Sequence, residues 1–130
     1  MEQILNSVLG SGNRHVQRLA AVSWNGDTST LNIQWAIDDN FSDALVKRSA
    51  MLDIEHMLEA ISKNRVSYDY RMIAFSGTFP LTDVYGNSAE EQVVSAIYSR
   101  ATLAKINWES FITDNIYIIA DSVWLSPSFR

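Results

Sequence analysis

The stretch Trp24–Ile37, with the sequence WNGDTSTLNIQWAI, predicts the first hairpin of an antiparallel β-sheet. Asn25-Gly26 is the strongest short hairpin signal, because both central residues of a tight turn must accept positive φ. After this turn, large apolar side chains alternate with polar or small ones over residues 30–37. A period of two directs one face of a strand to a core and the other towards water or a second layer.

The residues before this turn also have strand character. Over residues 15–24 several apolar side chains share one parity, which is interrupted only by Arg18. A second β segment is expected over residues 68–81. There, Gly77 predicts a bulge or a close approach of another group, and Pro80 predicts the end of a strand or a sheet edge.

Two later segments complete the predicted strands. Residues 90–99 fit both a helix and a strand. We assign a strand, because the turn-forming loop 82–88 would close a second hairpin and because Val, Ile and Tyr favour sheets. Residues 116–125, which precede Pro127, predict a buried segment that is more typical of a strand than of a helix.

Helical spacing marks three other segments. Residues 3–9 predict a short N-terminal helix that Gly10 ends, and residues 101–108 predict another short helix. Residues 42–63 predict a long helix, preceded by several N-cap residues. Its apolar stripe, with spacings of three and four, consists of Ala50, Met51, Ile54, Met57, Leu58 and Ile61.

This order of elements predicts the fold class. With no linker and no strong internal repeat, we expect one α+β domain over residues 1–130. The fold should be two-layered, with an antiparallel sheet of two hairpins covered by the long helix and accompanied by the short N-terminal helix. A fifth, C-terminal strand over residues 116–125 is left open.

Composition excludes several kinds of function. The 130-residue chain has no cysteine, which excludes disulfides, thiolate catalysis and cysteine-bound zinc. Its net charge is −5, with scattered basic residues, so we expect no nucleic-acid partner. No apolar run is long enough to insert into a membrane, and the first residues show no signal peptide. A cytoplasmic location is the default; an extracytoplasmic one follows if the domain was excised from an exported protein.

Several polar clusters contain the residue types of a metal-binding or catalytic site. Asp53, His56 and Glu59 share helical spacing and could hold a metal ion, but a solvated helix face explains them better. Asp38, Asn40 and Ser42 alternate like the start of a calcium loop, yet helix capping accounts for them. Likewise, the loop of residues 83–91 fits a polar turn better than a cation site. The sequence therefore nominates no catalytic, cofactor-binding or metal-binding residue.

Apolar residues outside the main stripe suggest a binding surface. Phe41, Leu45 and Leu52 lie roughly opposite that stripe, because spacings of four and seven keep them on one side of the helix. A helix that is apolar on two sides is either enclosed within the fold or presents a binding face. The C-terminal aromatic residues, including Trp108 and Trp124, could cover this side or contribute to the same contact.

Three functions follow from these patterns. The preferred one is a non-enzymatic protein-interaction module that binds a protein partner or forms a homodimer. In length, acidity and order of helices and hairpins, the chain also broadly resembles the type III secretion chaperones, which implies a small acidic chaperone or secretion adaptor. The third is a small α+β enzyme with an unrecognised pocket.

Overall fold

The computed structural model describes residues 1–64 and 69–130. Tyr68, the predicted start of the second β segment, lies outside the described residues. The elements follow one another along the chain as α1 (Glu2–Leu9), β1 (Leu19–Asn25), β2 (Thr30–Ala36), α2 (Asp43–Lys63), β3 (Met72–Thr82), β4 (Ser88–Ser99), α3 (Arg100–Leu103), η1 (Thr113–Asn115), β5 (Ser122–Leu125) and η2 (Pro127–Phe129). The α+β class is therefore confirmed.

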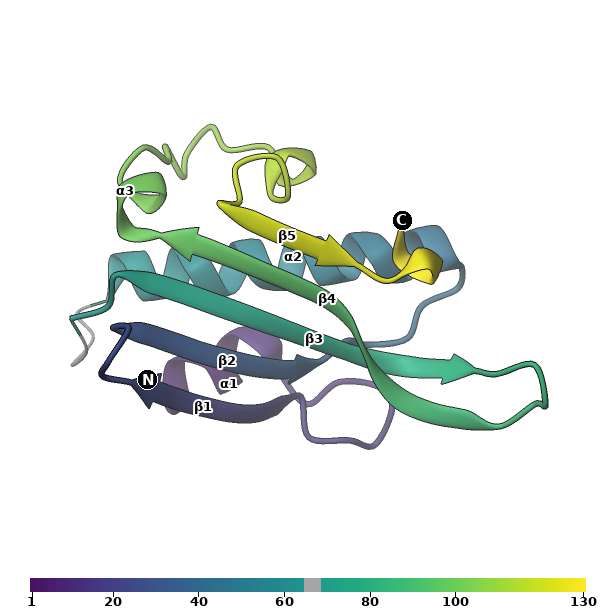
Figure 1. Ribbon diagram of the computed structural model, residues 1–130. Coiled ribbons are helices and arrows are strands. Elements are labelled where there is room, and N and C mark those ends of the chain that lie inside the picture. The colour runs from purple at the N-terminus through teal and green to yellow at the C-terminus, as the bar shows by residue number, and fades with distance from the viewer. Residues whose placement is uncertain (65–68) are drawn as a thin grey trace.

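The five strands form one mixed sheet in the order β1-β2-β3-β4-β5 (Figure 1). The two hairpins are antiparallel, as expected, but β2 and β3 pair in parallel from Thr30–Met72 to Ala36–Thr78. The prediction of a wholly antiparallel sheet was wrong. Its own long helix gives the reason: α2 has 21 residues and a length of about 31 Å, so it carries the chain back to the end where β2 began.

The first hairpin has a wider turn than Asn25-Gly26 predicts. Asn25 pairs with Thr30, which leaves the four residues 26–29 in the turn. Positive φ falls on Ser29, at 52°, and not on Gly26. The side-chain oxygen of Asn25 accepts the backbone N–H of Asp27 at 3.0 Å, which favours this wider turn.

The fold has two layers: in Figure 1, α1 and α2 lie behind the sheet. Three aromatic rings cross the covered face of the sheet: Trp35 packs edge-on against Phe75 at 6.1 Å, and Phe75 against Tyr98 at 6.0 Å. The predicted stripe of α2 lies on them, with Met51 half-buried and the rest buried. The other large, fully buried side chains include Leu5, Leu31, Ile33, Ile37 and Ile73.

Gly77 confirms both features predicted for it. The register of β3 and β4 shifts between Gly77 and Thr78, which is a β-bulge. A Cβ atom on Gly77 would also lie 2.8 Å from Cη2 of Trp35, so the indole occupies the space that a side chain would need. Beyond Thr78, where pairing with β2 ends, β3 and β4 continue as a two-stranded ribbon to their turn (Figure 1).

The C-terminal third is less regular than expected. The strand assigned to residues 90–99 is confirmed by β4, and the fifth strand exists, but β5 covers only residues 122–125. The predicted helix 101–108 is reduced to the single turn of α3. Further along, Trp108 and Phe111 pack against each other at 5.8 Å. The apolar side chains of this region pack against the core from an irregular segment and not from a helix.

Candidate functional site

The candidate site is an apolar surface where the β3–β4 ribbon extends past the N-terminal end of α2 (Figure 1). We call it the hairpin end, and it consists of the exposed side chains of Phe41, Leu45, Val84 and Tyr85 and of a nearby groove formed by α2, β3 and the C-terminal segment. The two pairs of exposed residues come from segments about 40 positions apart in the sequence. Tertiary structure brings them to one end of the molecule.

The turn of the ribbon holds Val84 and Tyr85 in water. Oδ1 of Asp83 accepts the backbone N–H groups of Tyr85 at 2.9 Å and Asn87 at 3.0 Å. Gly86 has a φ of 86°, a value that suits glycine and lets the turn close. Within this closed turn Val84 is 94% exposed and Tyr85 is 86% exposed. An ordered turn therefore displays two large apolar side chains.

Phe41 is exposed in the segment that precedes α2. Ser42 caps α2, because its hydroxyl oxygen accepts the backbone N–H of Leu45 at 3.2 Å. The backbone of Phe41 is fixed by Oδ1 of Asn40, which accepts its N–H at 2.8 Å. The Phe41 side chain is 100% exposed, and that of Leu45 is 43% exposed. A capped, hydrogen-bonded backbone thus carries an aromatic ring that is fully exposed.

A groove of about 320 Å³ lies near these exposed side chains, because Asp43 and Thr82 line it. Its apolar walls come from the end of β3, the first turn of α2 and the C-terminal segment. The ring centroids of Phe79 in β3 and Phe129 in the C-terminal segment lie 6.0 Å apart. The polar residues at its rim include Asp43, Lys47 and Thr82. A groove of this size can receive an apolar side chain of a partner.

The charges around the hairpin end are one-sided. Its cations are engaged within the chain: Arg14 forms a bidentate pair with Glu90, and Lys47 donates to the backbone carbonyl of Arg130 at 3.0 Å. By contrast, several carboxylates form no salt bridge with any residue that the structure describes: Asp39, Asp43, Asp83 and Glu91. Lys47 also forms no salt bridge with a described residue, so the apolar surface is bordered by more negative than positive charge.

The other residues predicted to contact a partner lie elsewhere. Leu52 is half-buried farther along α2, and Trp108 is half-buried against Phe111. Trp124 is 46% exposed, but it pairs with Ser95 on the face of the sheet that the helices leave uncovered. The structure therefore places Phe41 and Leu45, at the start of α2, at the same end of the molecule as Val84 and Tyr85, which sequence reasoning missed. Two large apolar residues inside an Asp-Gly-Asn turn were the available signal.

The cluster of Asp53, His56 and Glu59 does not form. His56 and Glu59 lie towards solvent, as a solvated helix face requires, but Asp53 points inward. Its Oδ2 accepts hydrogen bonds from Nη2 of Arg18 at 2.6 Å and from the indole of Trp35 at 3.0 Å. Burial raises the pKa of Asp53, and the attraction of Arg18 partly offsets this rise. The group is a structural ion pair.

Asp38 and Ser42, which suggested a calcium loop, have separate roles. Oδ1 of Asp38 accepts the backbone N–H of Asn13 and lies 3.3 Å from Nε of Arg18, whereas Ser42 caps α2. Among residues 1–64 and 69–130 no group of three or more His, Asp or Glu side chains could hold a metal ion. No described helix is long and apolar enough to cross a membrane.

Comparison of the chain with protein-family models, with curated proteins and with solved structures gave no match. The function is therefore inferred from the geometry of the chain itself.

Proposed function

We propose that this chain is a non-enzymatic protein-interaction module that binds its partner with the hairpin end. The single observation that carries the proposal is the exposure of Phe41, Val84 and Tyr85 at the end of the molecule that also holds an apolar groove. Exposure of large apolar side chains to water costs free energy, and a partner that covers them removes this cost. Aromatic residues around a pocket are also the side chains that dominate binding energy at protein interfaces.

The charge of the hairpin end selects the chemistry of the partner. Asp43 lines the groove and Asp83 precedes Val84 in the turn, and the whole chain carries a net charge of −5. A partner segment that combines large apolar residues with Lys or Arg would satisfy both features. The same charges disfavour a second copy of this chain, because a symmetric contact would bring like carboxylates together.

A peptide library tests both parts of this proposal. Wild-type protein should enrich displayed peptides that contain large apolar residues together with Lys or Arg. The triple variant Phe41→Ser/Val84→Ser/Tyr85→Ser should bind the selected peptides about tenfold or more weakly, because the contacting side chains are gone. Since the three residues are exposed, their replacement should leave the thermal unfolding of the chain nearly unchanged.

Trp124→Ser is the matched control, because Trp124 is an exposed aromatic residue on a different face. It should retain the affinity of the wild type. Selection of acidic peptides, or equal binding by the wild type and the triple variant, would overturn the proposal. Sedimentation equilibrium of the wild type is expected to give the monomer mass; a dimer that the triple variant abolishes would instead identify a second copy as the partner.

A further inference from the structure

A second, separate cavity lies in the segment between α3 and β5. Residues 104–121 contain no strand and no α-helix, and their only regular element is the single 3-10 turn η1. Irregular segments longer than about 12–15 residues are uncommon inside compact domains, and ordered ones are usually functional. We call residues 104–121 the C-terminal loop.

The C-terminal loop is fastened to the rest of the fold along its length. The hydroxyl of Tyr98 donates to the carbonyl of Ile116 at 2.7 Å, and Thr113 donates to the carboxylate of Glu55 at 3.1 Å. At its end, Oδ2 of Asp121 accepts the backbone N–H of Ser99 at 2.6 Å. Because these contacts reach β4 and α2, the cavity within the loop is formed before any ligand arrives.

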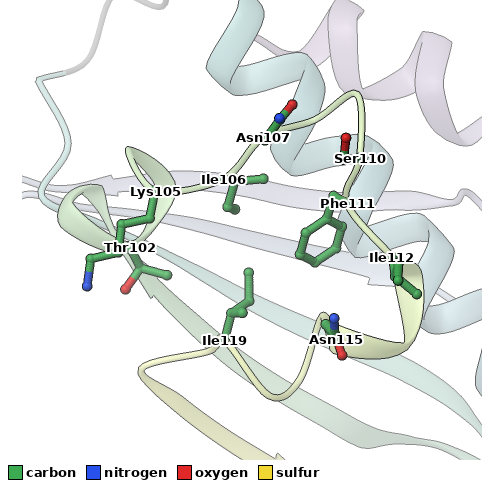
Figure 2. A pocket seen from close by; sticks show the side chains of 9 residues that line it. All are labelled: Thr102, Lys105, Ile106, Asn107, Ser110, Phe111, Ile112, Asn115 and Ile119. Carbon is green, nitrogen blue, oxygen red and sulfur yellow. The ribbon is translucent and has the colours of Figure 1, made fainter.

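This cavity has a volume of about 430 Å³, within the range of roughly 300–1,000 Å³ that small-molecule sites occupy. Figure 2 shows Ile106, Phe111 and Ile119 around its middle. Thr102 and Lys105 lie on one side of this centre, with Ile112 and Asn115 on the other. The Lys105 side chain runs outward, so its ammonium group lies at the outer edge of the cavity, away from the apolar centre.

Lys105 is the charged residue that lines this cavity, and no carboxylate lines it. Within the described part of the chain, its ammonium group forms no salt bridge and no side-chain hydrogen bond. Thr102 beside it is already engaged, because its hydroxyl donates to Oδ1 of Asp121 at 3.1 Å. Lys105 is therefore the group left to recognise a ligand at this end.

We propose that the cavity binds a small amphipathic carboxylate. Its apolar body would lie on Ile106, Phe111 and Ile119, and its carboxylate would pair with the ammonium of Lys105. One lysine suits a single negative charge, whereas phosphate groups are typically bound by several donors or by the fork of an arginine. An apolar cavity with few polar groups that fix orientation is the usual form of a small-molecule site.

Octanoate, 1-octanol and octylammonium test this assignment, because they share one apolar chain and differ in charge. In titrations followed by calorimetry and by amide NMR shifts, octanoate should bind most tightly and octylammonium least. The shifts should concentrate in residues 102–119. Lys105→Gln should weaken octanoate binding about fivefold and leave octanol binding unchanged, because only the charged ligand loses a partner.

Two further variants complete the test. Ile112→Ser removes an exposed apolar lining residue and should weaken octanoate and octanol alike, without loss of folding. Lys63→Gln, which changes a lysine on α2 that pairs with Glu59, should have no effect. Equal binding of the three ligands, an unchanged affinity in Lys105→Gln, or shifts confined to the hairpin end would overturn the proposal. The Phe41/Val84/Tyr85 triple variant should bind octanoate normally, so this proposal and the docking proposal fail separately.

Discussion

Arg18 donates a hydrogen bond of 2.6 Å from Nη2 to Oδ2 of Asp53, which joins the start of β1 to the middle of α2. The same guanidinium donates to the backbone carbonyls of Leu9 at 2.6 Å and Ala36 at 3.1 Å. One buried side chain thus fastens the end of α1, the end of β2 and the covering helix to one another.

Removal of either partner of this pair should be costly. Arg18→Met should lower the free energy of unfolding by about 3–5 kcal/mol, because it leaves the carboxylate of Asp53 buried without its cation. The measurement is urea denaturation. Arg48→Met is the control: its partner is Asp114, both side chains are largely exposed, and a loss of less than about 1 kcal/mol is expected.

The double variant Arg18→Met/Asp53→Leu sharpens this test. Because it leaves no unpaired carboxylate in the core, it should be more stable than Arg18→Met alone. A double variant that loses the sum of the two single losses would show that Arg18 and Asp53 are not coupled, in contradiction to their contact.

Two tyrosines should respond differently to loss of the hydroxyl. Tyr98 donates to the carbonyl of Ile116 at 2.7 Å, so Tyr98→Phe leaves a buried acceptor unpaired and should cost about 1–3 kcal/mol of stability. The buried hydroxyl of Tyr117 has no hydrogen-bond partner within the described residues. Tyr117→Phe should therefore be neutral or stabilising in thermal or urea unfolding. Equal losses in the two variants would contradict this assignment of partners.

Gly77 should not accept a side chain. The methyl group of Gly77→Ala would meet the indole of Trp35 at 2.8 Å, and relief of that overlap should cost about 1–3 kcal/mol in unfolding measurements. Gly26→Ala is the control, since the nearest atom to its added Cβ lies at 3.7 Å and its φ is not positive. If Gly77→Ala were as stable as Gly26→Ala, the packing of Trp35 against the bulge would be refuted.

Acid should remove the contribution of the Arg14–Glu90 pair. Partial burial favours the neutral acid, but hydrogen bonds from Arg14 and Thr78 outweigh it and lower the pKa of Glu90 below 4.5. A lowered pKa in the folded state gives stability that is present above pH 4.5 and is lost as the pH falls through the folded value. Glu90→Gln should therefore be less stable than the wild type at pH 7 and equal to it at about pH 2.

The expected difference at pH 7 is below about 1 kcal/mol, because solvent screens this partly exposed pair. Urea denaturation across that pH range measures it. Glu91→Gln is the control, since the neighbouring carboxylate forms no salt bridge in the part of the chain that the structure describes. A constant difference between Glu90→Gln and the wild type at every pH would rule out the ion pair as its source.

Local sequence determined the longer elements of this protein, although not the short helix and strand of its C-terminal third. The helical spacing over residues 42–63 reproduces α2, because an apolar stripe along a helix is a short-range pattern. Alternation over residues 30–37 reproduces β2 for the same reason. Even the bulge at Gly77 was readable, since a glycine within a strand removes the side chain that its surroundings cannot hold.

Only the tertiary structure decided how these elements meet. The parallel pairing of β2 with β3, the inward turn of Asp53 towards Arg18, and the position of the β3–β4 turn beyond the N-terminal end of α2 all bring distant segments together. Such contacts depend on the direction in which α2 returns the chain and on which charges find partners in the core. The pattern of neighbouring residues predicts neither the direction of α2 nor the pairing of charges. Such a pattern covers a few turns of the chain, whereas these contacts form across the whole fold.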